Sequence, residues 1–534
     1  MDTLSLTVHR SGAIGAERWP QGHPRRRQIL AVLCMSLLVV VIDNTVLNTA
    51  LPTLARTLHA GTSTLQWIVD AYTLAFAAML VPAGALGDRI GRRRTLVAGL
   101  VVFGISSLAA AFAPSSAVLI AERVAMGVGA ALVMPSTLSI LTAVFPAAER
   151  PGAIGAWSAV VGVGVVIGPS LGGLLLAHFW WGSVFLVNVP LSAAALLGVA
   201  LVVPESADDR RMRFDAVGAA LVAIGLIAVV DAIIEAPGRG WASPATLLLA
   251  GAGLATLAGF VLWERRVAHP LIDLTVFTSR SFSASAGAVT VIFFSLFGSL
   301  FAFTQYLQLV QGYSALGAGV RALPFALAMG VASPCSTVLA RRFGTRSVVA
   351  GGMLLMAGGL AALSTAGTTT GYPFLAACVS VMGAGMGLVM APASTTIMAV
   401  TPPGQAGAGS AVNDTIREVG GALGVAVVGS VTAARYAGLL APQLSAHGAP
   451  AAVTKLATGS VAAADAVGHR VGGHVGVQLI NAAHQAYVEG MSGGIRVAAV
   501  VAVAGALGAL LALPGPRAGG VATLRFPDTA AVAA

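Results

Sequence analysis

Fourteen long apolar stretches follow one another along the 534 residues of this chain, and this feature limits its fold more than any other. A helix that spans a membrane needs about 20 mostly apolar residues. Asp, Glu, Lys and Arg make up only 9% of the chain, whereas a soluble domain carries roughly 25%. Lipid must therefore surround most of the protein, and we expect an all-α integral membrane protein with fourteen transmembrane helices. We expect these helices at 29–52, 65–87, 95–113, 116–140, 152–176, 182–203, 214–235, 243–263, 284–310, 317–340, 346–366, 372–398, 406–432 and 493–514.

Arginines fall mostly on one side of the membrane when these stretches are threaded through it in turn. Clusters such as 25–27 and 92–94 gather on that side, and the short loops of the other side carry only Arg56 and Arg239. Cytoplasmic loops collect basic residues. We therefore expect a multi-pass protein of a bacterial inner membrane with both termini in the cytoplasm. We expect an external loop at 433–492, for which partly helical structure stays open. The net charge of +10 forms no basic stripe, so nucleic acid is not an expected partner.

No pattern in the sequence points to catalysis or to a bound cofactor. The three cysteines lie singly in apolar stretches without a nearby histidine cluster, which argues against a disulfide or a metal site. The motif GxxxxGK[ST], which binds nucleotide phosphates, does not occur. We expect a protein that is not an enzyme and has no cofactor, and that draws its energy from an ion gradient.

Four sequence motifs stand on or between the early stretches. The loop after the second reads GALGDRIGRRRTL, and the first stretch contains VIDNTVLNTALP. The fourth contains LIAERVAMGVGAA, and the fifth contains GVGVVIGPSLGG. Further segments in the same order are LQWIVDAYTLAFA, WWGSVFLVNVP, QYLQLVQGYSALGAGVRALP and SAVNDTIREVGGALGVAVVGS.

Together these motifs resemble the major facilitator superfamily, in its branch of fourteen-helix drug:proton antiporters. The WGS that follows Trp180 is similar to the subgroup that exports quaternary ammonium compounds and dyes. The resemblance implies two six-helix halves that rock around a central site. It implies these parts: a cytoplasmic tail 1–28, a first half 29–203, two inserted helices 214–263, a second half 284–514 and a cytoplasmic tail 515–534.

Charged residues inside a bilayer are costly and usually functional. Asp43 lies in the middle of the first stretch and is our candidate for carrying the proton, with a structural hydrogen-bond anchor as the alternative. The resemblance places Arg123 in the central cavity, where it is a partner for Asp43. We expect neutralising Asp43 to stop proton-coupled export without harming folding.

Other residues are candidates for binding a cationic substrate or for the conformational change. Asp70, Asp414 and Glu418 are candidate counter-charges, although Asp70 is equally explained as an interfacial carboxylate, and Asp414 and Glu418 as partners of Arg417. The aromatic candidates for stacking on a cation are Trp67 and Tyr72. Small residues of the fifth stretch are expected to pack closely and to form an interface between the halves. The candidate gating residues are Gly84, Asp88, Arg89, Gly91, Arg92, Gly164, Gly168, Pro169, Gly172 and Gly173.

The function that these features indicate is export of lipophilic, cationic drugs or antibiotics in exchange for protons, by a protein that acts as a monomer. Its partners would be the small-molecule substrate, protons and the lipid bilayer. Two alternatives stay open. The chain could export a single metabolite of its own cell, or it could be a membrane sensor that transports nothing, which the intramembrane acids disfavour.

Overall fold

The computed structural model describes residues 22–146, 148–205, 215–267, 270–271, 274–400 and 406–513. Within these ranges the chain is helical and has no strand. The expected tails 1–28 and 515–534 lie outside the described residues, apart from 22–28.

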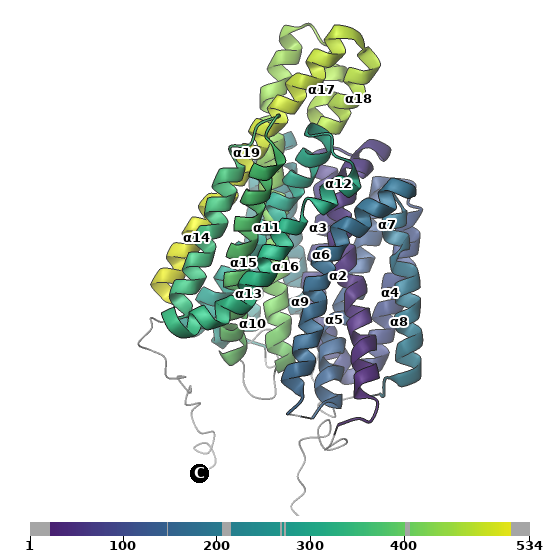
Figure 1. Cartoon of the computed structure of the whole chain (residues 1–534), viewed down its shortest axis with the longest axis vertical. Helices are drawn as coiled ribbons and strands as arrows, with labels where there is room; N and C mark the ends of the chain where they lie inside the picture. Colours follow the sequence, from purple (N-terminus) through teal and green to yellow (C-terminus); the bar gives the residue numbers. More distant parts are fainter. Residues whose placement is uncertain are drawn as a thin grey trace, which may run out of the picture.

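The helices form two groups that lie side by side, with a pair of helices inserted between them in the sequence (Figure 1). The first bundle comprises α2 (Arg26–Thr57), α3 (Thr62–Ile90), α4 (Arg92–Ala111), α5 (Ser116–Val144), α6 (Arg150–His178), α7 (Ser183–Leu186) and α8 (Asn188–Val202). The inserted pair is α9 (Ala216–Arg239) and α10 (Pro244–Glu264). The second bundle comprises η1 (Leu274–Thr278), α11 (Arg280–Gln305), η2 (Tyr306–Val310), α12 (Ala315–Val320), α13 (Leu323–Phe343), α14 (Thr345–Leu363), α15 (Tyr372–Val400), α16 (Ala406–Ala446) and α19 (Gly473–Ala512). Between α16 and α19 lie α17 (Ala451–Gly459) and α18 (Val461–Val471).

Local sequence explains where several helices begin. Ser115, Ser243, Ser279 and Ser314 precede α5, α10, α11 and α12, and each hydroxyl accepts a hydrogen bond from the backbone N–H three residues later. Such a cap satisfies one of the N–H groups that the first turn of a helix leaves without a partner. The helix starts are therefore encoded next to the apolar stretches themselves.

The bundle has two ends, which we name by what they carry. The terminus side is the end where α2 begins at Arg26 and α19 ends at Ala512. The hairpin side is the opposite end, where α17 and α18 project beyond the other helices (Figure 1). On the terminus side, a two-point hydrogen bond from Arg26 at 2.8 and 2.9 Å joins the start of α2 to Glu149, just before α6, and holds the pKa of Glu149 below its usual value.

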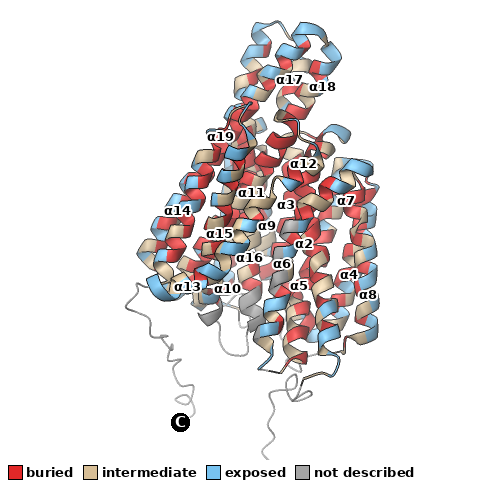
Figure 2. Cartoon of the chain, viewed as in Figure 1, coloured by how far each residue is buried: buried red, intermediate tan, exposed pale blue. Residues whose placement is uncertain are grey.

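Thirteen helices in the described part of the chain are long and apolar enough to cross a membrane. The fifth expected span, 152–176, corresponds to the 29-residue helix α6, in which Ile167–His178 is a shorter apolar stretch. The other thirteen expected spans each overlap one of the thirteen helices. Large apolar side chains are exposed on the outer faces, for example Leu248 at 74% and Leu511 at 84% (Figure 2). Those faces suit lipid rather than water.

The segment 433–492, expected as an external loop that could be partly helical, is mostly helical. α16 and α19 have 41 and 40 residues, which at about 1.5 Å per residue makes each roughly 60 Å long. That is about twice the hydrocarbon thickness of a bilayer, so both helices extend well past it. The hydroxyl of Tyr436 on α16 donates to the carbonyl of Ala457 on α17 at 2.9 Å. The segment is rich in alanine. Alanine is only weakly apolar, but it has the highest helix propensity of all residues.

The two bundles meet toward the hairpin side. Gln66 of α3 donates to the carbonyls of Val425 and Ala426 on α16, at 3.0 and 2.9 Å. Gln308 of η2 donates to the carbonyl of Thr49 on α2 at 2.8 Å. These side chains satisfy their own polar groups across the boundary between the bundles, so they hold this end of the molecule closed.

Candidate functional site

A buried ion pair joins α2 to α5. The Oδ2 atom of Asp43 lies 2.5 Å from an Nη atom of Arg123, and the side chains are 1% and 0% exposed. Arg123 also donates through Nε to the carbonyl of Ile68 at 3.1 Å. Its guanidinium lies over the ring of Tyr72, 4.2 Å from the centroid, a cation–π arrangement. The two residues proposed for proton coupling are thus brought together, although 80 positions separate them in the sequence.

Asn188 completes this pair, and the sequence reasoning missed it. Its side-chain amide donates to Oδ1 of Asp43 at 2.8 Å and to the hydroxyl of Ser107 at 3.2 Å. Both carboxylate oxygens of Asp43 are therefore engaged, one by a cation and one by a neutral donor. A buried asparagine inside the apolar run VFLVNVP was the available signal, since a buried amide must find partners.

Asp70 is fully buried, and neither carboxylate oxygen has a hydrogen-bond partner in the described structure. It lies on α3 one turn after Gln66, whose amide reaches α16. Residues four apart share a helix face. Asp70 therefore lies on the face of α3 that meets the second bundle, and a carboxylate buried there without a partner is costly unless it is neutral or compensated. The interfacial, wet alternative does not fit this burial.

The charged cluster on α16 forms one short ion pair. Arg417 lies 3.1 Å from Oδ1 of Asp414, and its guanidinium lies 4.7 Å from the centroid of Phe293 on α11. Glu418 makes no ion pair among the described residues, but it lies within electrostatic range of Tyr72, as do Asp43 and Arg123. Tyr72 is therefore near both the ion pair of the first bundle and a carboxylate of the second.

The two aromatic candidates are differently placed. Tyr72 is fully buried, and one of its ring faces is covered by Arg123. Trp67 is partly buried and packs on a small apolar cluster that includes Leu226 and Val230 of α9. The inserted pair thus contacts the first bundle at Trp67, which makes the packing explanation for this residue the stronger one in this conformation.

The glycine-rich loop after α3 lies on the terminus side. Gly91 separates α3 from α4 with φ at 109°, a value that side chains rarely adopt. Glu205, after α8, accepts from the backbone N–H of Arg93 at 3.2 Å and lies 3.7 Å from Arg94. Of the remaining candidates, Arg89 is exposed, Gly84 faces Pro135 of α5, and Arg92 begins α4. The side chain of Asp88 lies outside the described part of the structure.

The small residues of α6 divide between two partners, so the expectation that they form one interface between the halves is wrong for most of them. A Cβ atom on Gly164, Gly168 or Gly172 would meet Val41, Thr45 or Val46 of α2, which belongs to the same bundle. These glycines are four residues apart, which places them on one face of the helix, and that face packs within the first bundle.

Gly173 and Pro169 lie against the second bundle instead. A Cβ atom on Gly173 would lie 2.3 Å from Cα of Leu316 on α12. A Cβ atom on Gly319, also on α12, would lie 2.2 Å from the carbonyl oxygen of Pro169. The backbones of α6 and α12 therefore touch with no side chain between them. Sequence reasoning had not assigned α12 a role, although its GAG sequence was a signal for such an approach.

Comparisons with known proteins agree with this architecture. The family model described as "Major Facilitator Superfamily" matches residues 33–425. The chain is 36% identical over 422 residues to the multidrug resistance protein Stp of Mycobacterium tuberculosis, covering 78% of each chain. It is 34% identical to the tetracenomycin C resistance and export protein of Streptomyces glaucescens, covering 90% of each. It is 35% identical to the multidrug efflux pump LfrA of Mycolicibacterium smegmatis, covering 89% of this chain and 94% of LfrA.

A solved structure shares the fold. It is the inward-facing, unoccupied crystal structure of a bacterial homologue of the human lysosomal transporter Spinster. The TM-score is 0.64 at 18% identity, and the match covers 92% of this chain and 97% of the other.

Proposed function

The chain belongs to the major facilitator superfamily, and on that premise we propose that it exports lipophilic, cationic drugs or antibiotics from a bacterial cell in exchange for protons. Relatives named for multidrug resistance and multidrug efflux support export of drugs. The observation that carries proton coupling is the buried pair of Asp43 and Arg123. A transporter of this family handles small molecules at a site between its two halves.

Asp43 is the proton site in this proposal. Its carboxylate is held by Arg123 and Asn188, which is the arrangement of the deprotonated residue. Protonation would remove the charge that compensates Arg123, and a buried arginine stays charged. The guanidinium of Arg123 would then need another anion or different neighbouring groups. Protonation of Asp43 is therefore coupled to the positions of α2 and α5.

The cationic substrate would be held between the bundles by carboxylates that the ion pair does not use. Asp70 and Glu418 have no ion-pair partner among the described residues, and Asp70 lies on the face of α3 toward α16. Asp414 is a weaker candidate because Arg417 already holds it. A positive ligand in a medium of low dielectric constant gains most from a carboxylate that has no other counter-charge.

Closure of the hairpin side supports a direction for transport. The backbone contact between α6 and α12 and the cross-bundle bonds of Gln66 and Gln308 shut this end. In alternating access, one end closes while the other admits substrate. The arginine distribution indicates that both termini lie in the cytoplasm, so the closed hairpin side faces outward. In this proposal the protein acts as a monomer, and this conformation receives substrate from inside the cell.

Transport into inverted membrane vesicles tests the proposal. Vesicles that contain the chain should release lumenal protons when a lipophilic cation such as tetraphenylphosphonium is added. Vesicles that contain Asp43→Asn should not, at equal protein content. Accumulation of the cation without any proton movement in the parent protein would reject proton exchange.

Export of one metabolite of the producing cell is a second candidate. It is favoured by relatives named for tetracenomycin C export and as a probable actinorhodin transporter. A panel of chemically unrelated compounds separates the two, because a dedicated exporter would respond to a single chemical class only.

A further inference from the structure

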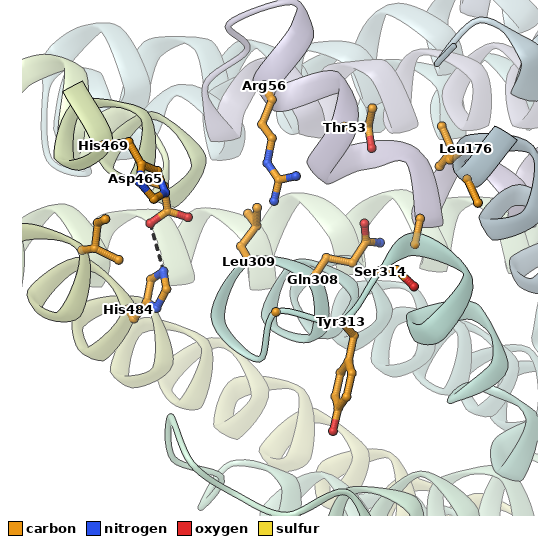
Figure 3. A pocket seen from close by; sticks show the side chains of 14 residues that line it. Thr53, Arg56, Leu176, Gln308, Leu309, Tyr313, Ser314, Asp465, His469 and His484 are labelled. Carbon is orange, nitrogen blue, oxygen red and sulfur yellow. Dashed lines mark hydrogen bonds and ion pairs between the residues drawn. The ribbon is translucent and has the colours of Figure 1, made fainter. Parts of the chain in front are cut away.

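A cavity lies on the hairpin side, next to the contact between α6 and α12. Its volume is about 520 Å³, within the range of sites that hold drug-sized molecules. Its walls come from the ends of α2 and α6, from the η2–α12 segment, and from α18 and α19 (Figure 3). Asp43, Arg123 and Asn188 do not line it.

The cavity lining contains a guanidinium that makes no ion pair among the described residues, that of Arg56. The lining also contains one carboxylate, Asp465, which is paired with His484 at 2.9 Å. Arg56 extends from α2 into the cavity toward Leu309 (Figure 3), and makes no ion pair among the described residues. His469 adds a third basic group. A guanidinium without an ion-pair partner favours an anion, and the carboxylate of the lining is already engaged by His484.

The rest of the wall suits the apolar body of a ligand. Leu176, Leu309 and Ile480 line it. Tyr313 is also a lining residue, and the guanidinium of Arg321 lies 3.6 Å from the centroid of its ring, so a further positive charge stands near this wall. The combination of an apolar wall and a guanidinium fits an amphipathic anion such as an aromatic sulfonate, carboxylate or phenolate.

We propose that this cavity binds an amphipathic anion, and that the bound anion holds the two bundles together on the hairpin side. Arg56 and Leu176 belong to the first bundle, whereas Gln308 and Ser314 belong to the second. Separating α6 from α12 pulls these walls apart. A ligand that contacts both walls binds the closed state more tightly than the open one, and therefore shifts the population toward closure. From outside the cell, such a ligand would act as an inhibitor of transport.

Binding is tested with two probes that share one ring system and differ in charge. The purified full chain in lipid nanodiscs is titrated calorimetrically with 2-naphthalenesulfonate and with (2-naphthyl)trimethylammonium. We expect the sulfonate to bind more tightly. Arg56→Gln should weaken its binding about tenfold or more, as loss of a charge-assisted contact requires. Arg56→Lys should retain part of it. Arg470→Gln, which removes an exposed arginine of α18 that does not line the cavity, should leave it unchanged.

Bridging is tested by the distance between spin labels at Phe179, after α6, and Thr369, between α14 and α15. Both positions are exposed, and Cys34, Cys335 and Cys378 are replaced by serine first. Saturating sulfonate should enrich the short-distance population, and Arg56→Gln should abolish that effect. Equal affinity of both probes, equal sulfonate affinity in Arg56→Gln, or an unchanged distance distribution at saturation would each overturn the proposal. Neither measurement requires the protein to transport anything, so the outcome is independent of its export activity.

Discussion

Asp43 and Arg123 stabilise each other in a setting where either charge alone would be costly. Both side chains are buried, and the pair is completed by Asn188. Removing one partner of a buried ion pair typically costs roughly 3–5 kcal/mol, because the other charge stays behind. The sequence alone suggested that neutralising Asp43 would not harm folding, and the structure changes that expectation.

Single and double substitutions separate the structural from the functional role of this pair. Asp43→Asn and Arg123→Gln should each lower the melting temperature of the purified protein, since each leaves one group without its ionic partner. The double variant should regain much of that stability but should not export. Melting is followed by intrinsic fluorescence in detergent. Single variants as stable as the parent would show that the pair contributes nothing to the fold.

Glu418 is proposed as the carboxylate of the second bundle that receives a cationic ligand, since Arg417 pairs with Asp414. Glu418→Gln should reduce export of lipophilic cations several-fold more than export of neutral compounds, because only a cation needs a counter-charge in a low-dielectric site. Initial export rates of a matched cationic and neutral pair measure this. Glu489→Gln, at an exposed position on α19, is the control. An equal fall for both compounds, together with less protein in the membrane, would make the residue structural.

At the scale of helices, the contact between α6 and α12 decides whether the hairpin side can close. Gly173→Ala places a methyl group 2.3 Å from the backbone of Leu316, so the helices must separate. We expect slower transport and longer distances between labels at Phe179 and Thr369. Gly152→Ala is the matched control on the same helix, because nothing lies within 4 Å of the added atom. Distances in Gly173→Ala that equal those in Gly152→Ala would contradict this assignment.

The sequence predicted the spans well because each is an uninterrupted apolar run, which length and charge alone identify. It could not show which way a helix face points. The repeat of Gly164, Gly168 and Gly172 is visible in the sequence, but only the packing shows that it faces α2, while Gly173 faces α12. Asn188 was missed for the same reason, since its partner Asp43 is 145 residues away. The sequence leaves helical structure open in 433–492 but does not give the bounds of α17 and α18, because these short helices are rich in alanine and only weakly apolar.

At the scale of the whole molecule, the two ends differ in charge and in structure. The loops of the terminus side hold the arginine clusters, and the hairpin side holds α17 and α18. This asymmetry predicts that the terminus side faces the cytoplasm. Cysteines at the exposed positions Thr278 and His447, on opposite sides, should react differently with an impermeant maleimide in whole cells. Only the cysteine at 447 should be labelled, and the opposite result would invert the topology.

The proposed transport requires coupling between the bundles, because Asp43 in the first bundle must respond to a ligand that is held between the two bundles. The most direct measurement is proton release from the purified protein in weakly buffered detergent when tetraphenylphosphonium is added. The parent protein should release protons, and Asp43→Asn should bind the cation without releasing any. Release from Asp43→Asn equal to that from the parent, with binding retained, would mean that another acid carries the proton, with Asp70 or Glu418 next in line.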